Sequence, residues 1–366
     1  MTLKKEKNPY VSILILFVIT RIVLFAAAYW LTGGDLKQAL YNFDIEHYLD
    51  IAQNGYKDYT VAFFPLIPML MRFFNLFGIP VLGTMLINNA AALLSAVILY
   101  KLTNNINCTR LFLCSPIAVF TFIAYTESLF ILLTLLVLYL YKNEKYFFAG
   151  ICLGLGVTCR SLAAMLFFSI FIVMAIKFFK KELSIKSIFK MYIPATLLSL
   201  TYPVFLQIKF GNWKAFVDVQ YDYWWRMPSN LITTIIKDIE FMMTQDSILQ
   251  HMQILYHFVL LLAMIALIIF AYKKLRKTKD EITFISIAYL ALSILSIYST
   301  CRIPQAGGLP SASFYRYFYG CISLYILPTI FSSELFEHLK NKYLLITEIF
   351  LSLFFAAFYF LNIFMC

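Results

Sequence analysis

The stretch VSILILFVITRIVLFAAAYWL, which runs from Val11 to Leu31, decides the fold class of this protein. Arg21 is its only charged residue, and it is as long as the roughly 20 apolar residues that a helix needs to cross a bilayer. Ala26 and Ala28 have the spacing of a signal-peptide cleavage site, but the apolar region of a signal peptide is only about 7 to 15 residues long. We therefore expect a first transmembrane helix that is retained in the protein.

The composition of the whole chain leads in the same direction. Its 366 residues are 62% hydrophobic and 13% charged, whereas soluble domains average roughly 45 to 50% apolar and about 25% charged residues. This composition excludes a water-soluble enzyme and a secreted module. We expect an all-α polytopic membrane protein in which residues 1–366 form a single integral-membrane domain.

Apolar segments of suitable length recur along the chain. We expect about eleven transmembrane helices, within a range of about ten to twelve, at 11–31, 62–78, 81–101, 110–123, 124–141, 146–178, 188–210, 250–272, 281–300, 313–332 and 344–365. The fourth segment is short, and the sixth is long enough for a steep tilt or for a break at Arg160. Gly154 and Gly156 in the sixth segment are typical of positions at which helices pack closely.

The net charge of +11 comes from short runs of Lys and Arg between apolar segments. This distribution follows the positive-inside rule and differs from the basic patch of a nucleic-acid-binding protein, so no nucleic acid is expected as a partner. The expected cytoplasmic segments are 1–10, 177–190 and 273–279, and the expected exoplasmic loops are 32–61, 211–249 and 301–312. Lys101, Arg110, Lys142 and Lys145 fall on the exoplasmic side in this topology and conflict with the rule.

The first exoplasmic loop contains the residues best suited to chemistry. Apolar residues in 41–56 recur with helical period up to an Asn-Gly stop, so we expect a short amphipathic helix that lies flat on the membrane surface. At about 100° per residue, Asp44 and His47 lie side by side, whereas Glu46 points toward the opposite face. Asp44 could then act as a general base toward a hydroxyl, with His47 orienting the acceptor or sharing the proton. The alternative is that Asp44 caps the helix and His47 is an interface residue.

Several motifs resemble those of a known family. The pattern F-D-x-x-H-Y-L-x-I-A-x-x-G-Y at 43–56, followed by AFFPLIP at 62–68, resembles the second mannosyltransferase of glycosylphosphatidylinositol assembly and its bacterial relatives. Ser115-Pro116, YTESLF at 125–130 and TCRS at 158–161 look like later motifs of this family in the same order. The family often has Trp where this chain has Phe43, and the similarity covers about residues 11–170.

The resemblance implies a polytopic glycosyltransferase of the GT-C class. Such enzymes take a sugar from a polyprenyl or dolichyl phosphate donor and use an acidic residue of the first exoplasmic loop, which Asp44 matches. The implied activity is inverting mannosyl transfer to a hydroxyl of a lipid or glycan acceptor. No cofactor would be required, because a departing lipid phosphate demands a metal less than a nucleoside diphosphate does. Asp44 and Glu46 have the spacing of a metal-binding D-x-D signature, so a divalent metal is possible, but on a helix the two side chains would point about 160° apart. The size and the richness in Lys, Ile and Asn suit a bacterial relative in the cell membrane, and a eukaryotic member would lie in the endoplasmic reticulum membrane.

A departing lipid phosphate needs positive charge beside it, and arginine within a membrane segment is a functional candidate by default. The candidates are Arg316, at the exoplasmic start of the tenth span, Arg160 and Arg21. For Arg160 and Arg21 the alternative is a salt bridge, for example to Glu127. Because Glu127 lies inside an apolar run, where acids are rarely unpaired, we predict a basic partner for it. Arg302 is either a substrate contact or a solvated loop residue.

Other roles fit parts of the same pattern. Glu46, Phe64 and Glu127 are candidates for substrate contact or for a structural role. A multi-pass transporter or lipid flippase also has many spans with a few buried charges, although the acids here crowd into exoplasmic loops. A non-catalytic subunit of a glycosylation complex is a third class of protein, and it would leave Asp44 dispensable. Membrane lipids are expected partners in every case, and the sequence names no protein partner.

Overall fold

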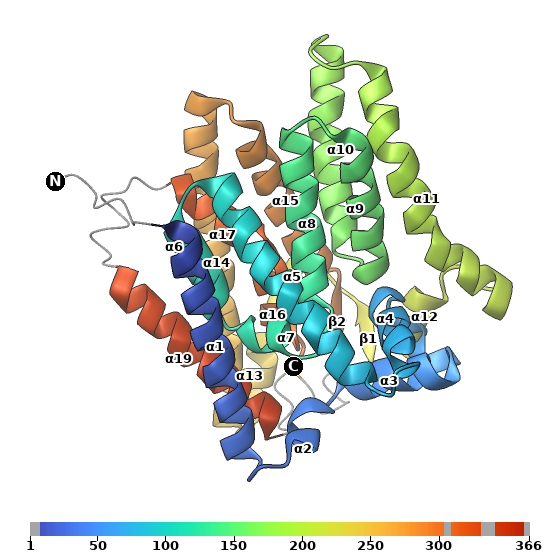
Figure 1. The fold of residues 1–366 in the computed structure, drawn as a ribbon, viewed down its shortest axis with the longest axis vertical. Helices are drawn as coiled ribbons and strands as arrows, with labels where there is room; N and C mark the ends of the chain where they lie inside the picture. The colour runs from blue at the N-terminus through green and yellow to red at the C-terminus, as the bar shows by residue number, and fades with distance from the viewer. Residues whose placement is uncertain (1–7, 304–308, 331–340, 362–366) are drawn as a thin grey trace.

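The computed structural model describes residues 8–303, 309–330 and 341–361, and the chain is helical over most of this length (Figure 1). The helices of the first half are α1 (Pro9–Leu31), α2 (Leu36–Leu40), α3 (Asp44–Asn54), the 3-10 helix η1 (Asp58–Ala62), α4 (Leu66–Asn75), α5 (Pro80–Thr103), α6 (Ile106–Cys114), α7 (Ala118–Phe122), α8 (Glu127–Lys142), α9 (Tyr146–Cys159) and α10 (Ala163–Phe179). Those of the second half are α11 (Ile185–Phe210), α12 (Ala215–Asp222), α13 (Leu231–Thr244), α14 (Ile248–Thr278), α15 (Glu281–Ile297), α16 (Phe314–Gly320), α17 (Ser323–Ile326), the 3-10 helix η3 (Leu327–Ile330) and α19 (Asn341–Phe360). Strands β1 (Arg226–Pro228) and β2 (Thr300–Arg302) form a small antiparallel pair. Most of the expected tail at 1–10, part of the loop at 301–312 and the end of the last expected span lie outside the described residues.

Local capping explains where several helices begin and end. Asn8 accepts a hydrogen bond from the backbone N–H of Tyr10, and Pro9 occupies the first turn of α1, where its missing N–H costs nothing. Asp280 caps α15 through the N–H of Thr283, at 2.8 Å. Gly211 ends α11 with a φ of 69°, a conformation that glycine adopts without steric cost.

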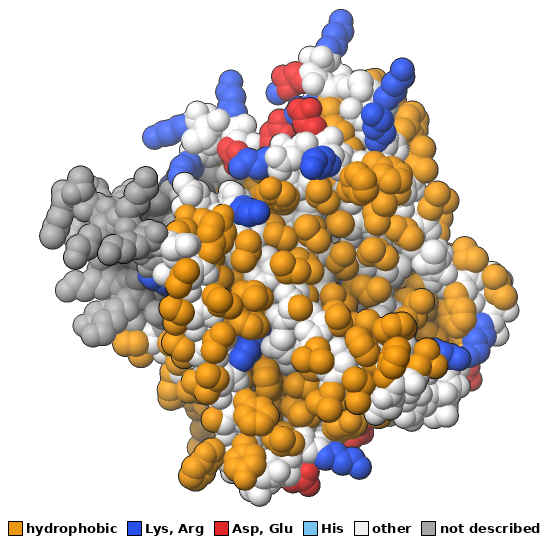
Figure 2. All heavy atoms as spheres, viewed as in Figure 1, with side chains coloured by type: hydrophobic (Ala, Val, Ile, Leu, Met, Phe, Trp, Pro, Cys, Tyr) orange, Lys and Arg blue, Asp and Glu red, His pale blue; other side chains and the backbone are white. Residues whose placement is uncertain are grey.

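Four helices of the described residues are long and apolar enough to cross a membrane, judged by length and composition: α1, α5, α11 and α14. The apolar side chains of α1 and α11 are largely on the outside, since only 17% and 22% of their apolar windows are buried, whereas half of that of α5 is. On the face shown in Figure 2, hydrophobic side chains form a broad band across the middle, and charged side chains gather above it. These features are those of a multi-pass membrane protein.

The helix within 62–78, the segment expected as the second span, is too short to cross a membrane. Within it, α4 has 10 residues, which is about 15 Å at the usual rise, about half of the hydrocarbon core. The helix starts only after Pro65, and the chain turns at Gly78, whose φ is 72°. The apolar run that predicted a span therefore includes a helix start, a short helix packed on α3 and α5, and a turn.

The segment expected as the sixth span, 146–178, consists of two antiparallel helices. Helix α9 begins beside the end of α8, where the ring centres of Tyr146 and Tyr141 are 5.8 Å apart. It ends beside the start of α8, where the Sγ of Cys159 donates a hydrogen bond to the carbonyl of Thr126 at 3.5 Å. Helix α10 then runs back, and its Lys177 pairs with Glu281 at 2.6 Å. The predicted break at Arg160 is confirmed, and it divides two helices.

Because 62–78 does not form a span and 146–178 forms two helices, the helices between these two segments run in the direction opposite to the one expected. Lys101 lies over the ring of Tyr139 at 6.0 Å, and the hydroxyl of Tyr141 donates to Glu281, the partner of Lys177. The expected placement of Lys101, Arg110, Lys142 and Lys145 opposite the lysine runs is thus corrected, since α5 and α8 end beside those runs. The lysine end, as we call it, comprises residues 101–110, 142–146, 177–190 and 273–281. The loop end, at the opposite end of the long helices, comprises residues 32–64, 211–247 and 298–313 (Figure 1).

Helices α9 and α11 approach one another closely through glycines. A Cβ on Gly150 would meet the carbonyl oxygen of Met191 at 2.0 Å, and one on Gly154 would meet Cβ of Leu198 at 2.5 Å. The expectation that small residues pack helices here is therefore confirmed for Gly154.

We predict that Gly150→Ala lowers the free energy of unfolding by about 1 to 3 kcal/mol, because backbone atoms would have to move apart. Thermal unfolding in detergent measures the effect. Gly320→Ala is the matched control, since its added Cβ would meet atoms no closer than 3.9 Å. Equal melting temperatures for the two variants would contradict the close packing of α9 and α11.

Candidate active site

A cavity of about 660 Å³ opens at the loop end of the helices. Its walls come from segments distant in sequence: the start of α3, residues 62–64, the start of α8, the α9–α10 connection, α12 with β1, and 296–302 with the start of α16. The charged side chains among its described lining residues are one acid and four arginines, namely Asp44, Arg160, Arg226, Arg302 and Arg316. Such a lining suits an anionic ligand.

Asp44 is the first residue of α3, and its side chain points at Arg316. One carboxylate oxygen lies 3.0 Å from a guanidinium nitrogen of Arg316, and the backbone N–H of Asp44 donates to the hydroxyl of Tyr125 at 3.3 Å. Phe43 before it has a φ of 52°, a left-handed conformation that is uncommon for a bulky residue. The Asp44 side chain remains 23% exposed, so one face of the carboxylate stays open to the cavity.

A buried carboxylate holds the arginines in place. Glu127 is fully buried, and its Oε1 accepts a hydrogen bond from Arg160 and lies 3.1 Å from Nε of Arg316. Arg160 also donates to the hydroxyl of Thr126 at 3.2 Å. The predicted basic partner of Glu127 is confirmed, and there are two. For Arg160, the salt bridge to Glu127 and a position on the cavity wall are both present.

Aromatic rings complete the support of the two guanidinium groups. Arg316 lies 5.2 Å from the ring centre of Tyr125 and 5.4 Å from that of Phe120, and Arg160 lies 5.0 Å from the ring of Tyr317. Cation–π contacts of this length are attractive, more so when water is excluded. The cluster thus combines two acids, two arginines and three aromatic residues, which come from α3, α7, the start of α8 and the residues before it, the α9–α10 connection and α16.

The other two arginines lie side by side on the two short strands. Arg226 on β1 and Arg302 on β2 are register partners, and both line the cavity. Arg226 donates to the carbonyl of Ala312 at 3.1 Å. Burial lowers the pKa of Arg302, and the charge of Arg226 lowers it further. Sequence reasoning missed Arg226: its only signal was its place after Trp224 and Trp225 in an aromatic loop.

His47 is not brought to the cavity with Asp44. Its ring stacks on Phe63 at 4.9 Å and meets Trp224 edge-on at 5.3 Å, and these two rings line the cavity where His47 does not. The indole N–H of Trp224 donates to the carbonyl of Tyr59, at 3.1 Å. His47 therefore belongs to the aromatic contact that joins the first and second loops.

Of the remaining candidate residues in the first half of the chain, one lines the cavity and two do not. Phe64 lines the cavity and packs on Tyr202 at 5.3 Å. Glu46 is exposed and is not among the lining residues.

Arg21 lies away from the cavity on α1, where it donates to the side chains of Asn89 at 2.8 Å and of Thr121 at 3.0 Å. Arg21 is therefore not brought together with the other candidate arginines, because α1 packs against α5, α6, α7 and α19 on another side of the bundle.

Within the described part of the chain, no group of three or more His, Cys, Asp or Glu side chains gathers as a set of metal ligands. Asp44 turns to the cavity and Glu46 to the outside, so the two acids do not converge as a D-x-E pair would have to. The groups that the cavity offers to an anion are guanidinium groups.

Comparison with known proteins identifies no family for this chain. No protein-family model matches the chain, and no curated protein matches its sequence. The function is therefore inferred from the residues of the cavity, together with the resemblance of the first-loop motif.

Proposed function

We propose that this protein is a multi-pass membrane glycosyltransferase of the GT-C class. It moves a sugar, mannose by the resemblance, from a polyprenyl or dolichyl phosphate donor to a hydroxyl of a lipid-linked or surface glycan acceptor, with inversion. The observation that carries the proposal is the composition of the cavity, in which one partly exposed carboxylate faces four arginines. A base and a phosphate clamp are the two elements that a single displacement needs.

In the proposed reaction Asp44 is the general base. The acceptor oxygen forms a bond to the anomeric carbon while its proton passes to the Asp44 carboxylate, and the bond between that carbon and the phosphate oxygen breaks with its electrons going to the phosphate. A positioned base of this kind contributes about 100- to 10,000-fold to a rate. Arg316 holds one carboxylate oxygen at 3.0 Å, so the other can face the acceptor.

The departing lipid phosphate would be held by guanidinium groups. Arg226 and Arg302 lie side by side on β1 and β2, and a planar guanidinium can bind phosphate through two parallel hydrogen bonds. Arg160 and Arg316 are already bonded to Glu127 and Asp44, so they add positive charge in a fixed position. Charge that is fixed in advance stabilises a transition state without reorganisation. This arrangement supplies the charge compensation without a required cofactor.

The distribution of charge supports a cavity on the exoplasmic side. If the lysine end is cytoplasmic, as the positive-inside rule favours, then Asp44 and the arginines face the opposite compartment. The topology we propose still has about eleven crossings, because the loss of 62–78 and the division of 146–178 compensate. Two of these crossings are runs of short helices: α6 with α7 in the segment expected at 110–123, and α16 with α17 and η3 in the segment expected at 313–332. The membrane we propose is the bacterial cell membrane.

Purified protein in lipid vesicles, supplied with labelled polyprenyl-phosphate mannose and candidate acceptor lipids, tests the proposal. We expect the labelled sugar to move to the acceptor with inverted configuration, in the presence of a chelator as well as in its absence. A nucleotide sugar should not replace the lipid donor. Translocation of the donor across the vesicle membrane without its consumption would instead establish the transporter class and overturn the proposal.

A further inference from the structure

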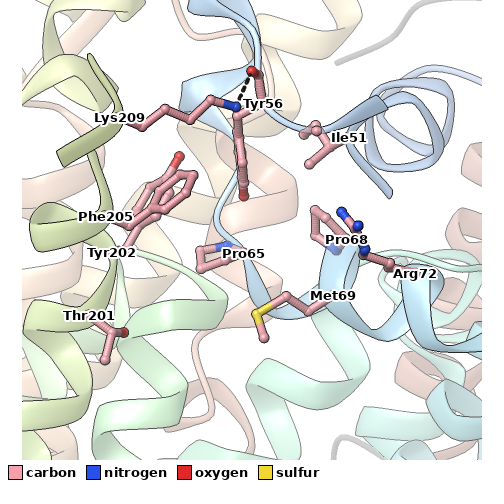
Figure 3. A pocket seen from close by; sticks show the side chains of 11 residues that line it. Ile51, Tyr56, Pro65, Pro68, Met69, Arg72, Thr201, Tyr202, Phe205 and Lys209 are labelled. Atoms are coloured by element: carbon pink, nitrogen blue, oxygen red, sulfur yellow. Dashed lines mark hydrogen bonds between the residues drawn. The ribbon is translucent and has the colours of Figure 1, made fainter. Parts of the chain in front are cut away.

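A second cavity, of about 350 Å³, lies between α3 and α4 on one side and α11 on the other. Figure 3 shows that its walls are mainly apolar, with the rings of Tyr202 and Phe205 facing Pro65 and Met69. Lys209 approaches from the end of α11, and Arg72 stands on the α4 side. We call this cavity the lateral cleft.

The lateral cleft adjoins a surface that is suited to lipid. Met69 of its lining is 65% exposed, and Ile208, beside Lys209 on α11, is 81% exposed. Helix α11 is one of the four helices of the described chain long enough to cross a membrane, and Lys209 lies in its last turn at the loop end. The cleft is thus placed where headgroups of the loop-end leaflet meet their acyl chains.

Two cations stand in this apolar setting. The ammonium group of Lys209 donates to the carbonyl of Tyr56 at 2.8 Å and forms no ion pair with the described acids. Arg72 is exposed between Met69 and Phe73 and likewise pairs with none of them. A cation among lipid-facing apolar side chains is costly unless it reaches an anion or the headgroup layer.

A wall separates the lateral cleft from the candidate active site. The hydroxyl of Tyr202 donates to the carbonyl of Val61 at 2.6 Å, and that of Tyr56 donates to the carbonyl of Phe63 at 2.9 Å. Phe64 lines the larger cavity and packs on Tyr202, which lines the cleft. A lipid phosphate beside Lys209 and Arg72 would therefore be on the far side of this wall from Asp44, which distinguishes it from a sugar donor.

We propose that the lateral cleft binds an anionic phospholipid of the loop-end leaflet. Its phosphate lies between Lys209 and Arg72, and an acyl chain lies along Met69 and Phe205. This assignment is independent of the proposed transferase activity. It adds a lipid site that stabilises the wall formed by 61–65, since Tyr56 and Tyr202 belong to both the cleft and the wall.

Native mass spectrometry of the detergent-purified chain tests the site with phosphatidylglycerol, phosphatidylcholine, undecaprenyl phosphate and inorganic phosphate as separate probes. We expect phosphatidylglycerol to be retained in preference to phosphatidylcholine, and inorganic phosphate to bind only weakly. The double variant Arg72→Gln/Lys209→Gln should lose about 10- to 30-fold in affinity for phosphatidylglycerol. The matched control Lys214→Gln, another exposed cation of the loop end that pairs with Asp218, should bind as the wild type does.

A second variant fills the cleft without changing its charge. Thr201→Trp places a ring in the apolar part of the cleft, and we expect less bound phosphatidylglycerol at an unchanged melting temperature. Equal retention of the two phospholipids, or unchanged binding by the double variant, would overturn the site. Preferential binding of undecaprenyl phosphate that depends on Arg72 and Lys209 would overturn the assignment to a membrane phospholipid.

Discussion

Asp44→Asn should lower the rate of sugar transfer by about 100- to 10,000-fold, the usual contribution of a general base, and leave the protein folded. The amide has the shape of the carboxylate, and its oxygen can still accept the hydrogen bond that Arg316 donates at 3.0 Å. It cannot take up the proton of an acceptor hydroxyl. Single-turnover transfer from labelled polyprenyl-phosphate mannose measures the chemical step directly.

Asp50→Asn, on the same helix, is the matched control. Asp50 pairs with Lys57 at 2.7 Å and accepts from Asn54 at 2.7 Å, and it does not line the cavity. Hydrogen bonds from Lys57 and Asn54 lower the pKa of Asp50 below its usual range, so this carboxylate is charged at neutral pH. Transfer at the wild-type rate by Asp44→Asn, or an equal loss in both variants, would remove Asp44 from its role as base.

The sequence correctly predicted a helical membrane protein. It predicted less well where the individual helices begin and end. The apolar run from Val11 to Leu31 predicted α1 because composition and length decide that case. At 62–78 the same criterion failed, because hydropathy does not register that a helix starts only after Pro65 and that the chain turns at Gly78. At 146–178 the charge of Arg160 marked the break between α9 and α10, so a local polar signal could correct the count.

The members of the candidate site could be predicted in part, and their contacts could not. The loop motif singled out Asp44, and arginine in apolar segments singled out Arg160 and Arg316. The bond between Asp44 and Arg316 joins residues 272 positions apart, and no helical periodicity carries information over that distance. The same limit applies to Arg226, whose register with Arg302 exists only in the folded strands.

Spacing also placed His47 with Asp44, which the fold does not bring into one cavity. Residues three apart share a side of a helix, but Asp44 begins its helix and turns toward Arg316, whereas His47 stacks on Phe63. The direction of a side chain at a helix start thus depends on its partner as much as on its angle around the axis.

Glu127→Gln should be the most destabilising change in the cluster, lowering the free energy of unfolding by about 3 to 5 kcal/mol. The carboxylate is fully buried and is shared by Arg160 and Arg316. A neutral amide leaves two buried guanidinium groups with Asp44 as the one remaining acid of the cluster. An uncompensated buried charge costs more than the loss of one neutral hydrogen bond. Denaturant unfolding in mixed micelles measures the difference.

Ser128→Ala separates the effect of charge from that of burial, because Ser128 is the next residue on α8, is fully buried and donates one neutral hydrogen bond to the carbonyl of Thr121. It should cost only about 1 kcal/mol. Adding Arg160→Gln to Glu127→Gln removes one of the two cations, so the double variant should be more stable than the sum of the single effects predicts. A Glu127→Gln protein no less stable than Ser128→Ala, or strictly additive effects in the double variant, would mean that the charge of Glu127 does not hold the two arginines beside Asp44.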